Sequence, residues 1–204
     1  MPPRNGTEDM ALTDPPDILK SRHLPLTSVE GTLFRISHQK FPDPIYWSRR
    51  GLYRFDSPVA KYGVLYTGRT FETALLEVFD DQWLTSRTTA RDFLKRFDVC
   101  EIGLEPRLKV VNLSGKQLNP LGTGANIFAS LAYDVTEEWA CVFMEHPDEP
   151  HGIRYPSRKN QRSHNFALFS TPAATAAVTV TQSYPLLEHP QLFRLLQSYK
   201  VALI

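Results

Sequence analysis

Cysteine is scarce in this chain of 204 residues, which has only Cys100 and Cys141. The two lie far apart, and neither belongs to a CxxC motif or to a Cys/His pattern with the spacing of a zinc site. The sequence therefore predicts neither a disulfide framework nor a zinc centre. Two reduced thiols in a cytoplasmic protein are the simpler interpretation.

Long apolar runs are also missing. No stretch approaches the roughly 20 apolar residues that a membrane span needs. The first residues, MPPRNGTEDMALTDPP, lack the apolar core of a secretory signal. We therefore expect no membrane association and a cytoplasmic location.

Charge of one sign is not in excess. Lys and Arg number 23, Asp and Glu number 22, and the formal net charge is +1. Whole-chain electrostatics thus gives no reason to expect direct binding of nucleic acid. A local basic pocket is compatible with this balance.

Several common catalytic motifs are absent. The glycines of GTGAN (122–126) are not followed by the GK[ST] of a phosphate-binding loop, and there is no HExxH or GxSxG. The six histidines show no metal-site spacing. We expect no metal.

The remaining composition is that of a globular protein, with 42% hydrophobic and 22% charged residues. One domain accounts for this length. Residues 1–30 are rich in proline and polar residues and predict a loosely ordered N-terminal arm, which could dock through DILKSRHLPL. We expect the folded domain to occupy residues 31–204.

Within that domain the patterns predict strands and helices in mixed order, which favours an α+β fold. The alternation of TLFRISH places Arg35 on the same strand face as Leu33. The stretches 96–104 and 108–114, joined by Glu105 and Pro106, are typical of a hairpin. Predicted strands cover 32–38, 64–68, 96–104, 108–114, 165–170 and 176–184; predicted helices cover 70–81, 134–146 and 189–199; residues 200–204 could add a last strand.

The helix predicted at 70–81 carries one glutamate in an informative position. Thr70 is available as its N-cap, and a core stripe is formed by Phe71, Ala74, Leu75 and Val78. At about 100° per residue, Glu77 lies roughly 60° from Ala74, at the edge of that stripe. We expect its carboxylate to be partly buried, and a buried carboxylate needs a partner.

Arginine and tyrosine are concentrated in a long loop before this helix, residues 39–63, and in HGIRYPSRKNQRSHNFALF (151–169). Long loops inside a compact domain are often functional. Guanidinium groups bind phosphate oxygens, aromatic rings stack, and a carboxylate stabilises a cationic sugar. The combination suits a nucleotide, although arginines near a glycine-rich loop are more often part of a solvated surface.

The order LFRI, GLYRFDSP, VLYTG, FETALLEVF and GIRYPSRKN…NFALF resembles the RES domain family, named for an arginine, a glutamate and a serine. Those three are Arg35, Glu77 and Ser157 here. The resemblance covers about residues 31–172. It departs from the family's glycine-rich GGRW/F element, which appears here as GLYRF with Gly51 alone retained.

The resemblance implies a single mixed-sheet domain similar to the ADP-ribosyltransferase and diphtheria-toxin fold. It also implies a toxin of a toxin–antitoxin pair that consumes NAD, by glycohydrolysis, phosphorolysis or transfer of ADP-ribose to a protein. Expected partners are NAD and an Xre-type antitoxin, and a homodimer is possible.

The same resemblance assigns roles to individual residues. Arg35 and Arg54 would contact the phosphates or a ribose, Tyr66 the nicotinamide side, and Ser157 the substrate. Glu77 would be the catalytic carboxylate, and Tyr46 is a further candidate for binding NAD. The acceptor of the ADP-ribose is left open between water, phosphate and a protein side chain.

Structural roles are possible for the same residues. Arg35 could form an ion pair with Glu77 or Asp80, Tyr66 could be a core tyrosine, and Ser157 could cap a turn. The whole protein could also be a non-catalytic nucleotide-binding or interaction module.

Overall fold

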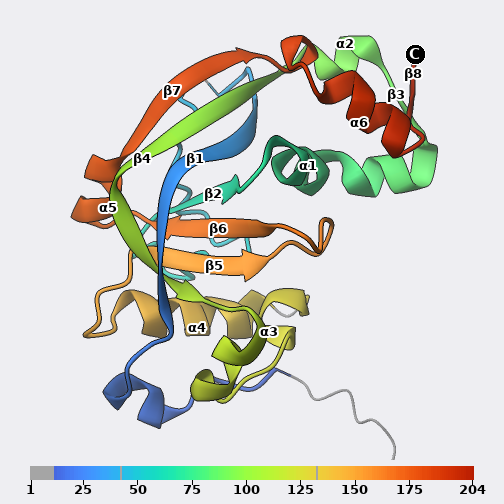
Figure 1. Cartoon of the computed structure of the whole chain (residues 1–204). Coiled ribbons are helices and arrows are strands. Elements are labelled where there is room, and N and C mark those ends of the chain that lie inside the picture. The colour runs from blue at the N-terminus through green and yellow to red at the C-terminus, as the bar shows by residue number, and fades with distance from the viewer. Residues whose placement is uncertain (1–11, 42, 132) are drawn as a thin grey trace, which may run out of the picture.

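The structure is a computed structural model that describes residues 12–41, 43–131 and 133–204. Within these residues, six strands form one mixed sheet in the order β1-β2-β6-β5-β4-β7 (Figure 1). β4 and β5 are parallel and the other neighbours are antiparallel. The strands are β1 (Leu26–His38), β2 (Val64–Gly68), β4 (Phe97–Asn112), β5 (Gly152–Pro156), β6 (His164–Phe169) and β7 (Val178–Pro185).

β1 also pairs with β4, so that β1, β2, β6, β5 and β4 form a closed circuit. A separate parallel pair is formed by β3 (Thr88–Thr89) and β8 (Ala202–Leu203). The predicted α+β class, with a single mixed sheet as the main element, is confirmed. Among the described helices, none is both long and apolar enough to cross a membrane.

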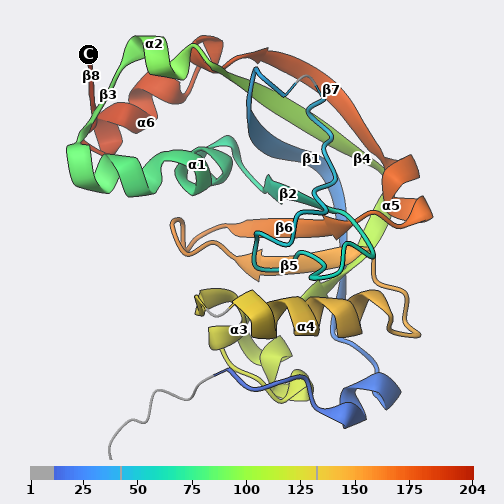
Figure 2. The ribbon, with the colours of Figure 1, turned by 180° about the vertical axis from the view of Figure 1, so that it is seen from behind.

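The helices lie in two groups on either side of the β5–β6 hairpin (Figures 1 and 2). At one end are α1 (Phe71–Ser86), α2 (Arg91–Leu94) and α6 (Leu192–Ser198), with the 3₁₀ turn η3 (Leu186–Glu188). At the other end are α3 (Asn126–Ala129) and α4 (Tyr133–Met144), with the 3₁₀ turns η1 (Asp17–Ser21) and η2 (Gly115–Leu121). α5 (Pro172–Ala177) precedes β7.

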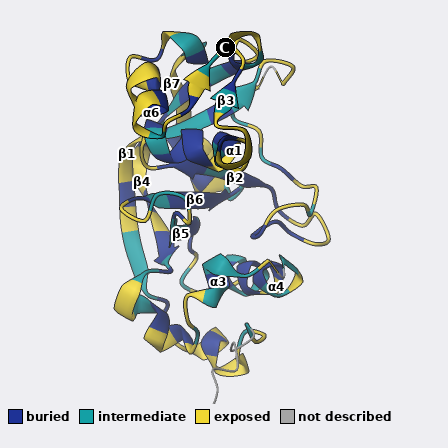
Figure 3. Cartoon of the chain, turned by 90° about the vertical axis from the view of Figure 1, so that its right-hand side faces the viewer, coloured by how far each residue is buried: buried dark blue, intermediate teal, exposed yellow. Residues whose placement is uncertain are grey.

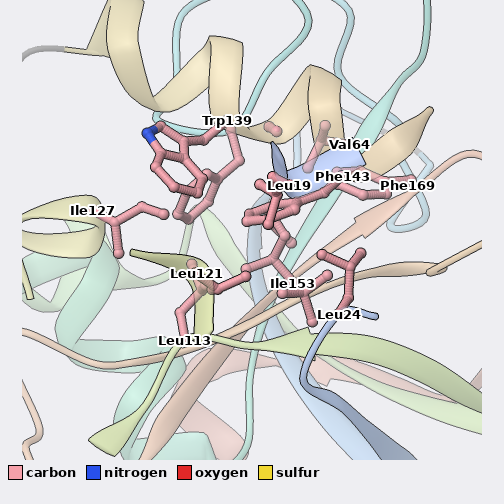
Figure 4. Close-up of a cluster of buried hydrophobic side chains, with 14 of the residues drawn as sticks. Leu19, Leu24, Val64, Leu113, Leu121, Ile127, Trp139, Phe143, Ile153 and Phe169 are labelled. Carbon is pink, nitrogen blue, oxygen red and sulfur yellow. The ribbon is translucent and has the colours of Figure 1, made fainter. Parts of the chain in front are cut away.

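Three clusters of buried side chains hold these layers together. One joins α4, η1 and η2 to β2, β5 and β6 (Figure 4). The second packs α1 and α6 against β1 and β4, and the third fills the space between β1, β2, β4, β6 and α5. The β5–β6 hairpin therefore lies between two helical layers, each of which has its own apolar core.

The N-terminal segment is integrated into the first cluster as far as the structure describes it. Leu19 is buried, the Trp139 indole N–H donates to the carbonyl of Thr13 (2.8 Å), and the Leu24 amide donates to Asp148 (2.7 Å). β1 then begins at Leu26. Residues 1–11 of the predicted arm lie outside the described residues.

The predicted hairpin through Glu105 and Pro106 is wrong. Residues 97–112 form one strand, β4, and both of its halves pair with β1. The register shifts between Val29 and Gly31, where Gly31 has a φ of 78°. Proline lacks an N–H for the ladder, and a bulge beside it allows the strand to bend without reversing.

α1 is longer than predicted, and its buried face differs. The Thr70 side chain caps it as expected, accepting from the Thr73 amide (3.2 Å). The helix continues to Ser86 because Phe79 and Trp83 extend the buried stripe. Val78, predicted to be in the core, is exposed. The second cluster of buried side chains packs on the side of the helix that carries Phe79.

This difference generates a stability prediction. Phe79 is 1% exposed and Val78 is 45% exposed. Phe79→Ala should lower the free energy of unfolding by about 3–5 kcal/mol, because it leaves a cavity among aromatic rings. Val78→Ala is the matched control and should change it by no more than about 0.5 kcal/mol. Urea unfolding measures both, and equal losses would contradict the observed orientation of α1.

Candidate functional site

Glu77 is connected to the β5–β6 hairpin by two hydrogen bonds to one carboxylate oxygen. Its Oε1 accepts from the Ser157 hydroxyl (2.8 Å) and from the Asn165 side-chain amide (2.7 Å). Ser157 and Asn165 are only 2% and 3% exposed. In Figure 3 the view runs along α1, and β6 and β5 lie beneath it. Two residues predicted to act together, Glu77 and Ser157, are thus in direct contact.

Glu77 itself is exposed, so its predicted partial burial is wrong. Helix periodicity gives only the angle of a residue relative to the core stripe. Beyond that edge the neighbouring element is the end of a hairpin, which supplies partners on one side and leaves the other side open. Oε2 has no hydrogen-bond partner within the described residues.

Ser157 is fixed by the turn that follows β5. Its hydroxyl oxygen accepts from the amides of Lys159 (3.2 Å) and Asn160 (3.0 Å), and its own amide donates to the carbonyl of Ser163 (3.0 Å). Ser157 therefore has the contacts of a turn-capping serine, and its hydroxyl hydrogen remains for Glu77. This arrangement holds the hydroxyl, and through it the carboxylate, in one orientation.

Tyr155 is a site residue that the sequence interpretation missed. Burial raises its pKa, the negative charge of Glu77 raises it further, and Arg54 acts in the opposite direction. Its hydroxyl therefore stays protonated at neutral pH and is a donor. The signal was available, because Tyr155 and Ser157 are two residues apart and share a strand face.

Asn165 was missed as well. It pairs with Tyr155 in the antiparallel β5–β6 register. Recognising NQRS as the turn of a hairpin would have placed Asn165 across from Tyr155, on the face of the sheet that meets Glu77.

Arg54 is buried next to these groups. Its guanidinium donates to the Ser130 carbonyl and lies 5.0 Å from the centre of the Tyr133 ring. Burial lowers its pKa. Arginine keeps its charge at neutral pH despite such a shift. Arg54 thus supplies a fixed positive charge. Among the described residues, no acidic side chain forms an ion pair with it.

Arg35 is a residue of β1, and its Nη1 donates a hydrogen bond to the Tyr66 carbonyl on β2 (3.1 Å). Its buried Nε has no partner in the described part of the chain, and burial lowers its pKa. The predicted alternative of an ion pair with Glu77 or Asp80 is not observed: Asp80 pairs with Lys159 (3.2 Å). Arg35 is therefore a half-buried cation with an unused donor.

Tyr66 closes the preceding loop. Its hydroxyl donates to Asp56 (3.0 Å) and accepts from the Phe55 amide (3.0 Å), while the other Asp56 oxygen accepts from the Leu52 amide (3.1 Å). These bonds, with Gly51 at a φ of 61°, define the shape of GLYRF. The hydroxyl is satisfied within the protein, so Tyr66 offers a ligand its ring.

Tyr46 is not brought to the other candidates. It is exposed, and its described contact is with Arg50, whose guanidinium lies 5.9 Å from the ring centre. A surface depression of about 550 Å³ lies near the start of α1, and its lining includes Arg69, Glu72 and Arg162. None of the predicted site residues lines it. The residues that the structure does gather are Glu77, Ser157, Tyr155, Asn165 and Arg54.

Within residues 12–41, 43–131 and 133–204, no group of three or more His, Cys, Asp or Glu side chains is placed to hold a metal ion.

A model of the RES domain family matches residues 32–187. A similar solved structure is MbcT in the crystal structure of the M. tuberculosis MbcT–MbcA toxin–antitoxin complex, with a TM-score of 0.62 and 16% sequence identity over 85% of this chain and 92% of that chain. At this identity the likeness shows the fold alone. No curated protein sequence matches significantly.

The hydrogen bonds of Tyr66 generate a prediction. Tyr66→Phe leaves Asp56 and the Phe55 amide without that partner, and should lower the free energy of unfolding at pH 7 by about 1–3 kcal/mol. Tyr53→Phe is the control, because Tyr53 is exposed and packs edge-on against Tyr66. Chemical denaturation measures both; no loss in Tyr66→Phe would contradict its structural role.

The stability difference should also depend on pH. Burial and Asp56 raise the pKa of Tyr66 in the folded state above the value of about 10 in an unfolded chain. The stabilisation is therefore complete below pH 10 and is lost as the pH rises toward the folded pKa. The difference between the wild type and Tyr66→Phe should shrink above pH 10.

Proposed function

Since the chain belongs to the RES domain family, we propose that it is an NAD-consuming enzyme and the toxin of a toxin–antitoxin pair. The proposed reaction is cleavage of the bond between nicotinamide and ribose. One observation supports it most: the Glu77 carboxylate is held through Oε1 by Ser157 and Asn165, and its Oε2 lacks a partner in the described structure.

The residues present suit NAD as a substrate. Arg35 has a buried Nε without a partner, and Arg54 is a buried cation beside two tyrosines. Both would bind phosphate or ribose oxygens. Tyr66 would face the nicotinamide with its ring, and Ser157 would act by orienting Glu77. Tyr46 remains a candidate for contact with NAD from the loop. No metal is required.

The proposed role of Glu77 is electrostatic. As neutral nicotinamide leaves, positive charge develops on the ribose in an oxocarbenium-like transition state. A fixed anionic oxygen close to that charge lowers the barrier, because it needs no reorganisation during the reaction. The hydrogen bonds of Ser157 and Asn165 stabilise the ionised carboxylate and fix its direction.

The acceptor decides the enzyme class. Water gives a glycohydrolase and inorganic phosphate a phosphorylase, and these are our first proposal. A protein side chain would give an ADP-ribosyltransferase, which is the alternative. A non-catalytic module that only binds a nucleotide is the contrasting proposal.

For partners, we propose a cognate antitoxin of the Xre type that covers the NAD site. The fold similarity to a protein solved as a toxin–antitoxin complex supports a partner of this kind. We expect the toxin to act in the cytoplasm, as a monomer or a homodimer. We expect it to bind neither nucleic acid nor a membrane directly. We propose residues 31–204 as the RES domain; within the preceding segment 1–30, the residues from Leu26 onward already belong to its first strand, β1.

Nicotinamide release tests the reaction and the residue together. The wild type should release nicotinamide from NAD, and Glu77→Gln should lower the rate by about 100- to 1000-fold, because the variant loses the anionic oxygen. Asp81→Asn is the matched control, since Asp81 lies one turn further along α1 and is highly exposed. Its rate should equal that of the wild type.

Product analysis identifies the acceptor. ADP-ribose indicates water, ADP-ribose 1″-phosphate formed only with added phosphate indicates phosphorolysis, and labelled protein indicates transfer. A wild type that binds NAD and releases no nicotinamide would support the non-catalytic module.

The toxin role has a separate test in cells. Expression of the wild type should arrest growth and deplete NAD, whereas Glu77→Gln should do neither at equal protein level. Arrest that persists in the Glu77→Gln variant would show that toxicity does not depend on the proposed reaction.

A further inference from the structure

Asn165 has an orientation that its hydrogen bond to Glu77 determines. The two ends of an asparagine amide differ, because the nitrogen donates hydrogen bonds and the oxygen accepts them. Here the neighbour is a carboxylate oxygen at 2.7 Å, which accepts from an N–H and repels a carbonyl oxygen. Nδ2 must therefore face Glu77, and Oδ1 must be the other atom.

That second atom is an acceptor without a partner. Oδ1 of Asn165 is buried and makes no hydrogen bond with any described residue. A buried acceptor left unpaired destabilises a protein, and groups of this kind in native structures commonly serve a ligand or a water. A donor supplied by a ligand would satisfy it.

Two acceptors of this hydrogen-bonded pair therefore have no partner among the described residues. One is Oε2 of Glu77, and the other is Oδ1 of Asn165; a single hydrogen bond joins the two side chains. Acceptors on two joined side chains suit a ligand with two neighbouring O–H donors. The nicotinamide-side ribose of NAD carries such a pair in its 2′- and 3′-hydroxyls.

We propose that Asn165 positions Glu77 through Nδ2 and binds one ribose hydroxyl of NAD through Oδ1, while Oε2 of Glu77 receives the other. The inference rests on the proposed function. It adds a substrate contact and accounts for the buried amide oxygen, which the interaction with Glu77 leaves unexplained.

The first experiment compares kcat/KM for NAD with that for NAD lacking either the 2′- or the 3′-hydroxyl on the nicotinamide-side ribose. Deoxygenation changes the intrinsic reactivity equally in every variant, so the comparison between variants isolates the contact. For one of the two deoxy substrates, the effect of removal should be at least about tenfold smaller in Asn165→Ala than in the wild type. Equal effects for both substrates would overturn the contact.

The second experiment tests the positioning role with an isosteric variant that keeps the volume of the buried side chain. Asn165→Asp places a second carboxyl group against Glu77, and two close carboxylates cannot both ionise easily. The acidic limb of the pH–rate profile should move up by at least about one pH unit. An unchanged limb would overturn the positioning role.

Asn160 provides the matched controls. It lies in the turn between β5 and β6, and its side-chain amide donates to Glu72 (3.3 Å) instead of Glu77. Asn160→Ala and Asn160→Asp should keep the wild-type substrate comparison and pH profile. Circular dichroism and thermal unfolding establish that each variant is folded.

The outcomes separate this inference from the proposed function. An active wild type with Asn165 variants that behave as the Asn160 controls contradicts the role of Asn165 alone. A wild type that neither binds nor cleaves NAD contradicts both. If Asn165→Ala does not fold, the pH profile of Asn165→Asp still decides the positioning role.

Discussion

The contact between Glu77 and the β5–β6 hairpin is the interaction on which the candidate site depends. A carboxylate on an exposed helix position has many rotamers and a mobile charge. Hydrogen bonds from Ser157 and Asn165 to the same oxygen restrict both. Because those two donors are almost completely buried, they hold Glu77 with the rigidity of the sheet, although Glu77 itself is open to solvent.

This contact exists because two separate cores fix its two sides. α1 is anchored by aromatic side chains against β1, β4 and α6, and the hairpin is anchored by the strands around it and by the core beneath α4. Neither core includes Glu77, Ser157 or Asn165, whereas Tyr155 packs against the first of them. The site thus lies at the boundary between apolar layers, where polar groups can be held by their neighbours and still reach a ligand.

Arg35 and Arg54 differ from ordinary surface arginines. Arg35 and Arg54 are buried or half-buried, and neither forms an ion pair with an acid among the described residues. Keeping an unpaired charge away from water is unfavourable, and a bound phosphate would relieve it. Tyr66 illustrates the opposite case, since its hydroxyl is occupied by Asp56 and the loop it closes.

The sequence by itself determined the local features. The apolar periodicity predicted α1, and Thr70 was predicted as its cap. The Gly and Pro residues that interrupt regular structure predicted the loop at 39–63. The order of the motifs indicated the family. Local patterns are sufficient there because caps, turns and amphipathic faces are set by residues a few positions apart. The same logic failed at Glu105 and Pro106, where a turn signal is bypassed because both halves of β4 pair with one distant strand.

Only the tertiary structure decided how the candidate residues meet. It brought Asn165 and Ser157 to one oxygen of Glu77, joined Tyr155 to them, left Tyr46 apart, and exposed Val78. The two contacts of Glu77 join residues 80 and 88 positions apart in the sequence. Such contacts follow from strand pairing and layer packing, which periodicity along the chain does not encode.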